Sequence, residues 1–178
     1  MKTLKFLSLS LVFLLFGCAS TSSIISEFDE EVDFDSYSTY VLCIDDLFVE
    51  NTNFPNHDNN EVRGIIGDAI EKQMEKRGHK TNVLNPELQA GFRLVVQEKE
   101  ATFTNCDQQG EYEYWKECTI DTVIYTEETL VLYVSDINKN QVIWQASVTC
   151  DLNRSKNKIE GYVNQLVESL FNEYPKAR

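Results

Sequence analysis

Two neighbouring segments, residues 127–136 and 141–151, constrain the fold more than any other part of the chain. Apolar residues alternate with others along both segments, at Leu130, Leu132 and Val134 in the first and at Val142, Trp144, Ala146, Val148 and Cys150 in the second. A period of two indicates strands with one face on a core. Asn138-Lys139-Asn140 between them are typical turn residues, so the sequence predicts an antiparallel hairpin whose apolar face needs a covering layer.

Two amphipathic helices are predicted to provide that layer, because apolar residues recur at helical spacing in two segments. They are Val62, Ile65, Ile66, Ala69, Ile70 and Met74 in the first helix, and Ile159, Tyr162, Val163, Leu166, Val167, Leu170, Phe171 and Tyr174 in the second. We expect Asp58 to cap the start of the first helix and Gly78 to cap its end, while Pro175 ends the second. Gly64 and Gly67 lower helix propensity, which close packing against a sheet would offset.

Two further strands are predicted at residues 39–44 and 91–103. Between them come a long loop at residues 45–60 and then the first helix. The second of these strands turns polar at residues 97–100, so we expect it to leave the core near its end. Together the elements predict an α+β fold, a largely antiparallel sheet of about four to five strands with two helices packed on one face.

The N-terminus is typical of an export signal. Lys2 and Lys5 precede an apolar run at residues 6–16, which is shorter than the ~20 residues of a membrane-spanning helix. Leu15, Gly17 and Cys18 resemble the lipobox of bacterial lipoproteins, which implies cleavage before Cys18 and acyl chains, palmitate among them, on that cysteine. The alternative is an ordinary secretory signal cut near Ala19.

The lipobox interpretation divides the chain into a signal peptide at residues 1–17, a lipidated tether at 18–26 and a single domain at 27–178. It predicts a lipid-anchored protein that faces the periplasm, at the outer membrane. The formal charge is −13, and loss of Lys2 and Lys5 makes the mature chain −15. Nucleic acid and anionic head groups would repel such a surface. We therefore expect no nucleic-acid partner and a membrane contact through the lipid on Cys18 alone.

Four cysteines remain besides Cys18, an even number that predicts disulfides in an exported domain. Cys106 and Cys118 bracket a polar and aromatic segment expected to protrude as a hairpin, and their pairing would stabilise the fold by ~3 kcal/mol. Cys43 and Cys150 would then pair by elimination, or Cys150 would be a buried free thiol. No Cys-x2-Cys spacing occurs, so we expect no zinc or other metal.

Catalytic motifs are scarce. The two histidines, His57 and His79, fall in a loop and just after a helix end, where solvated side chains are expected, and neither a Gly-x-Ser-x-Gly nor a His-Glu-x-x-His motif occurs. Carboxylate pairs of the kind that hydrolyse glycosides occur by chance in so acidic a chain; here they are Glu98 with Glu100 and Glu111 with Glu113. The sequence predicts neither an enzyme nor a cofactor.

Aromatic residues gather between Cys106 and Cys118, at Tyr112, Tyr114 and Trp115. Large rings on a cross-linked loop provide contact area at low entropic cost, as binding surfaces do. The alternative is that these rings fold back to cover a sheet edge.

Four patches of the mature chain share a further pattern. They are Asp-Phe-Asp-Ser-Tyr-Ser-Thr-Tyr at residues 33–40, Lys-Arg-Gly-His at 76–79, residues 129–144 with their hairpin turn and Trp144, and the closing Tyr174-Pro175. With the lipobox, they resemble the lipoproteins of the domain of unknown function 4136 family. Glu128 departs from that pattern, where Gly is expected, as do Gln145 and Ala146. The resemblance implies a fold and a location but no active site.

Three function classes follow. The first is a non-catalytic envelope lipoprotein that binds a partner protein, a glycan or a small amphiphile. The second is an accessory or structural subunit of an outer-membrane assembly or maintenance machine, by analogy of outline. The third is a hydrolase that uses carboxylates, which would require a concave pocket with convergent acidic side chains.

Overall fold

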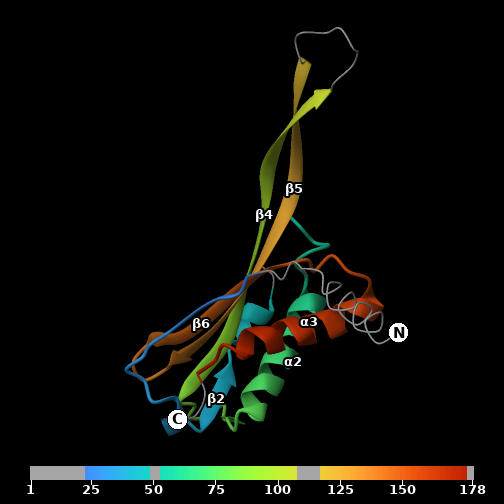
Figure 1. Ribbon diagram of the computed structural model, residues 1–178. Coiled ribbons are helices and arrows are strands. Elements are labelled where there is room, and N and C mark those ends of the chain that lie inside the picture. The colour runs from blue at the N-terminus through green and yellow to red at the C-terminus, as the bar shows by residue number, and fades with distance from the viewer. Residues whose placement is uncertain (1–22, 49–52, 108–116, 176–178) are drawn as a thin grey trace, which may run out of the picture.

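The computed structural model describes residues 23–48, 53–107 and 117–175, and for residues 105–107 and 117–119 it describes the backbone only. Six strands form one sheet in the order β1-β6-β5-β4-β2-β3 (Figure 1). The elements along the chain are β1 (Ile25–Phe28), the 3-10 turn η2 (Phe34–Ser36), β2 (Thr39–Leu42), the 3-10 turn η3 (Ile44–Leu47), α2 (Asn60–Lys76), β3 (Lys80–Thr81), β4 (Leu88–Asp107), β5 (Glu117–Asp136), β6 (Gln141–Cys150) and α3 (Lys156–Phe171). None of the helices in these ranges has the length and apolarity needed to cross a bilayer.

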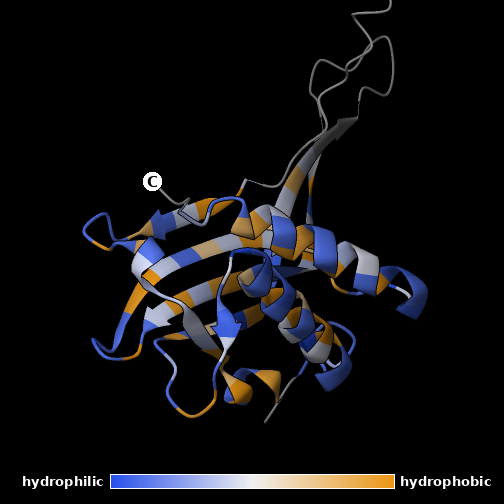
Figure 2. Ribbon diagram, turned by 90° about the horizontal axis from the view of Figure 1, so that it is seen from below, coloured by the Kyte–Doolittle hydropathy of each residue, from blue (hydrophilic) through white to orange (hydrophobic). Residues whose placement is uncertain are grey.

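The predicted α+β fold is confirmed, with both helices on one face of a mostly antiparallel sheet (Figure 2). The sheet has six strands rather than four to five, because the sequence predicted neither β1 nor β3, which are four and two residues long. β1 pairs with β6 and includes two residues that the sequence assigned to the tether. β2 runs parallel to β3 and β4.

The core lies between the sheet and the two helices. Trp144 of β6 is 1% exposed and packs against Phe171 and Tyr174, with ring centroids 5.0 and 5.2 Å away. Full burial of a large apolar side chain contributes roughly 1.5–3 kcal/mol. Other fully buried large side chains come from β2, α2, β4, β5 and α3, among them Tyr40, Ile66, Ile70, Met74, Phe92, Leu130 and Leu132.

The ends of α2 are held by side-chain and backbone hydrogen bonds. Asn59 caps the start, since its side-chain oxygen accepts a hydrogen bond from the Val62 amide at 3.0 Å. The predicted cap, Asp58, is wrong: its carboxylate instead accepts two hydrogen bonds from the guanidinium of Arg63, at 2.6 and 2.8 Å. Gly78 ends the helix as predicted, with a positive φ of 93° that glycine adopts without steric cost.

Two glycines allow close approach. A Cβ on Gly67 would lie 2.6 Å from Leu47 of η3, which explains a glycine inside α2. On the sheet face opposite the helices, Gly91 of β4 lies directly across from Tyr133 of β5, whose side chain occupies the space that a Cβ on Gly91 would need. The Tyr133 hydroxyl donates to Asp46 at 2.7 Å.

Candidate functional site: a projecting β arm

β4 and β5 form a ribbon that extends well beyond the rest of the sheet (Figure 1). They pair without interruption from Leu88 opposite Asp136 to Asp107 opposite Glu117. β6 pairs with β5 only as far as Glu128, so residues 97–107 and 117–127 form a two-stranded arm, here called the β arm. At ~3.3 Å per residue, the β4 strand of this arm is roughly 33 Å long. The prediction that this strand leaves the core near its end is confirmed, and the exit begins at residue 97.

Apolar side chains of the β arm lie in solvent. Ile120 is 70% exposed, Ile124 62% and Phe103 58%, and Val123 and Tyr125 are also exposed. An isolated two-stranded hairpin is marginally stable in water because it buries little surface. Contiguous exposed apolar side chains on such a ribbon are typical of a contact surface.

Both faces of the β arm carry these side chains. Phe103 and Val123 are diagonal neighbours on one face, since Phe103 pairs with Asp121 and Val123 with Ala101. Ile120 and Ile124 lie on the opposite face. The charges of residues 97–104 and 120–127 are four carboxylates, at Glu98, Glu100, Asp121 and Glu127, and one ammonium, at Lys99, which pairs with Glu127. The β arm is therefore apolar and acidic.

A buried carboxylate holds the root of the β arm. Glu128 is 3% exposed; one of its oxygens accepts a hydrogen bond from the Leu152 amide at 2.6 Å, and the other pairs with Nδ1 of His57. The expectation of a solvated His57 is wrong, because folding brings it against a residue 71 positions away. The network ties β5, where the arm begins, to the loop before α2 and the connection after β6.

Cys150 lies opposite Glu128 in the sheet, but this cluster lacks an activated nucleophile. Burial, and then the charge of Glu128, raise the pKa of the Cys150 thiol to about 12, so the thiol keeps its proton at neutral pH. Low-pKa cysteines that act as nucleophiles have the opposite surroundings, with cations or helix N-termini beside them.

Pairing of Cys43 with Cys150 is wrong, since both are free thiols. Cys43 directly follows β2 and Cys150 ends β6, with β4 and β5 between these strands. Three strand spacings of ~4.8 Å place the backbones at Cys43 and Cys150 roughly 14 Å apart. A disulfide spans at most ~7 Å between Cα atoms. The alternative prediction, that Cys150 is a free thiol, is confirmed.

Cys106 lies directly opposite Cys118 in the β4–β5 register. Opposed Cα atoms of antiparallel strands are ~4.5–5.5 Å apart, within the range of disulfides. The disulfide itself stays a prediction. Cys18 and the aromatic residues Tyr112, Tyr114 and Trp115 lie outside the described residues, and so do Glu111 and Glu113.

In the part of the chain that the structure describes, no three His, Cys, Asp or Glu side chains gather to hold a metal ion. Glu98 and Glu100 lie on the β arm, one facing Thr126 and the other Ile124 across the strands. The sequence did not show how far β5 extends. The run of β-branched residues at 119–126 is a signal that could have indicated it.

The fold defines a class, an α+β domain with two helices on one face of an open sheet. The chain belongs to the family described as Domain of unknown function (DUF4136), whose model matches residues 24–176. No curated protein matches the chain.

Two solved structures share this fold. One is a DUF4136 family protein from Bacteroides thetaiotaomicron, with 12% identity and a TM-score of 0.54, over 90% of this chain and 100% of that one. The other is a PDZ domain protein from Parabacteroides distasonis, with 12% identity and a TM-score of 0.55, over 88% of this chain. This chain spans only 36% of the length of that PDZ domain protein.

Proposed function

We propose that this protein is a lipid-anchored, non-catalytic interaction module of the bacterial cell envelope, and that its β arm docks onto a partner protein. The observation that carries the proposal is the exposure of Phe103, Ile120 and Ile124 on a ribbon that projects from the domain. Apolar side chains held away from the body contribute nothing to its core, whereas their burial in a complex would favour association.

The partner surface that fits the β arm is an apolar groove bordered by lysine or arginine. The arm carries a net charge of −3 over residues 97–104 and 120–127, so a basic border would complement it and speed association. A second copy of this chain, at −15, and an anionic lipid surface would both repel the arm. These two occupants are therefore disfavoured against a basic protein groove.

The anchor is the acyl chains on Cys18, and the domain faces the periplasm from the outer membrane. Cys18 precedes β1 by seven residues, which reach at most ~25 Å when fully extended. Two or more acyl chains hold a protein stably on a bilayer. The tether would keep the acidic domain close to a membrane that its surface charge disfavours.

Photocrosslinking tests the docking proposal. A photoreactive residue at Thr122 of the β arm should crosslink one envelope protein in cells. The double variant Ile120→Ser and Ile124→Ser should abolish that crosslink, while the matched control Leu84→Ser should keep it, because Leu84 is 97% exposed but lies before β4, away from the arm. Raising the ionic strength in isolated envelopes should weaken the crosslink. Equal crosslinking by both variants, or a crosslink to a second copy of this chain, would contradict the proposal.

A further inference from the structure

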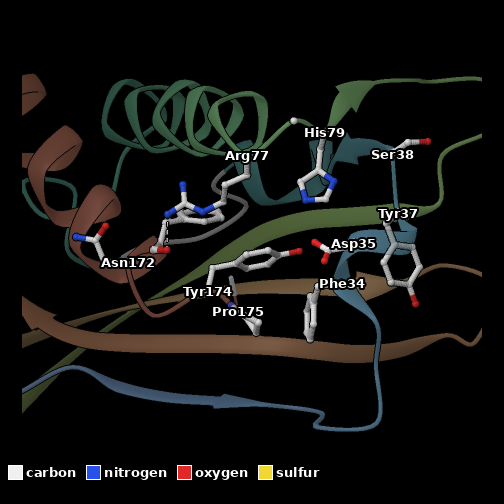
Figure 3. Close-up of a pocket in the computed structure, with 11 residues that line it drawn as sticks. Phe34, Asp35, Tyr37, Ser38, Arg77, His79, Asn172, Tyr174 and Pro175 are labelled. Carbon is white, nitrogen blue, oxygen red and sulfur yellow. Dashed lines mark hydrogen bonds between the residues drawn. The ribbon is translucent and has the colours of Figure 1, made fainter. Parts of the chain in front are cut away.

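A second site lies at the C-terminal ends of the two helices, where α2, α3 and η2 meet around a cavity of about 460 Å³ (Figure 3). Phe34, Arg77, His79 and Tyr174 are among its lining residues. His79 directly follows the Gly78 cap of α2, and Tyr174 follows the last turn of α3, its amide donating to the Phe171 carbonyl at 3.1 Å. The expectation of a solvated His79 is wrong, because the helix end turns this side chain inward.

Aromatic packing fixes the side chain of Tyr174. Its ring meets that of Phe34 edge-on with centroids 5.3 Å apart, and that of His79 at 6.1 Å. It also packs against Trp144, with ring centroids 5.2 Å apart. The hydroxyl of Tyr174 is therefore held in one place.

Two polar atoms of the cavity wall have no hydrogen-bond partner among the described residues. They are Nδ1 of His79 and the hydroxyl of Tyr174, and both side chains are more than nine-tenths buried. Buried polar groups in native proteins are normally satisfied. Figure 3 shows the imidazole and the hydroxyl directed toward the same space, with the carboxylate of Asp35 beside them.

The protonation states of the two groups are complementary. Burial lowers the pKa of His79, partly opposed by a hydrogen bond to the Tyr37 backbone, so the imidazole is neutral at pH 7. Since Nδ1 makes no hydrogen bond, it is the other ring nitrogen, Nε2, that donates its proton to the Tyr37 backbone. In a neutral imidazole Nδ1 then carries no proton and is a hydrogen-bond acceptor. Burial also raises the pKa of Tyr174, so its hydroxyl keeps a proton to donate. The cavity thus offers one acceptor and one donor.

Arg77 does not turn this cavity into an anion site. Its guanidinium donates to the Gln73 carbonyl and side chain at 3.1 and 2.8 Å and to the Phe171 carbonyl, and it lies 5.0 Å from the centre of the Phe171 ring. These hydrogen bonds use donors of the Arg77 guanidinium, and the carboxylate of Asp35, which also lines the cavity, offsets its positive charge. A neutral ligand fits better than a carboxylate or phosphate.

We propose that the cavity at the ends of α2 and α3 binds a neutral polyhydroxylated ligand, such as one sugar unit of an envelope glycan. A hydroxyl group donates to Nδ1 of His79 and accepts from Tyr174 at once, which no purely apolar ligand does. The volume accommodates several waters or one hexose ring. The ring of Phe34 provides an apolar surface for the C–H face of the sugar.

Titration of the mature protein in detergent with glucose and N-acetylglucosamine, followed by NMR and by tryptophan fluorescence, tests this proposal. Tyr174→Phe removes only the hydroxyl, so binding should weaken about tenfold, while thermal stability should stay equal or rise because an unpaired buried group is lost. Tyr125→Phe on the β arm is the matched control and should bind as the wild type does. His79→Phe should also weaken binding.

Three results would overturn the proposal. One is that neither sugar shifts the resonances of the lining residues, as expected if the cavity holds only ordered water. A second is that acetate or phosphate binds more tightly than both sugars. The third is sugar binding that Tyr174→Phe and His79→Phe leave unchanged. None of these results bears on the β arm, which lies at the opposite end of the sheet.

Discussion

The Glu128 network at the root of the β arm leads to a prediction for folding stability. In Glu128→Ala, the Leu152 amide and the His57 ring both lose their partner. An unsatisfied buried donor costs about 1–3 kcal/mol, and the Leu152 amide becomes such a donor. We expect the free energy of unfolding to fall by about 1–3 kcal/mol, which corresponds to roughly 2–12 °C in melting temperature for a domain of this size.

Urea unfolding followed by tryptophan fluorescence measures this loss, because Trp144, one of the two tryptophans, is 1% exposed in the fold. Glu128→Gln keeps an acceptor for the Leu152 amide and should lose less than Glu128→Ala. A double-mutant cycle with His57→Ala isolates the His57–Glu128 interaction, and we expect a coupling energy above ~1 kcal/mol. A loss below ~1 kcal/mol for Glu128→Ala, or strictly additive effects in the cycle, would refute the role assigned to this network.

Three further predictions concern the cysteines and the pH dependence. Cys106 and Cys118 should be protected from alkylation until a reductant is added, and Cys106→Ser should raise protease cleavage between β4 and β5; free thiols at both positions in protein from the periplasm would contradict the disulfide. Cys18→Ser should release the protein from membranes or leave its signal uncut, as fractionation would show, and normal processing with unchanged membrane association would argue against the lipid. Hydrogen bonds from Ser38 and Thr39 lower the pKa of Glu87 to about 2, below the unfolded value near 4.5, so its contribution to stability is present above pH ~4.5 and disappears as the pH falls toward 2. Acid unfolding curves should lose that component in Glu87→Gln, and identical curves for variant and wild type would rule it out.

Long and local patterns were readable from the sequence. The stripes of α2 and α3 and the alternation of β5 and β6 extend over ten or more residues each, so the two helices, the hairpin and the layer that covers it were all predictable. The glycine at position 78 was also predictable as a helix end, because its conformation depends on its own backbone. The expected cap at Asp58 was off by one residue, because three Asx side chains follow one another at 58–60 and each could cap the helix.

The tertiary structure alone decided the rest, because it depends on contacts between distant residues. β1 and β3 exist through pairing with neighbours and are too short to have a period of their own. His57 meets Glu128 across 71 positions, and His79 meets Tyr174 only where the ends of α2 and α3 converge. Residue type predicted these two histidines to be solvated, whereas packing buries His79 and places a partly exposed His57 against Glu128. The sequence by itself thus determined the layers of the domain, and the fold determined which polar side chains those layers enclose.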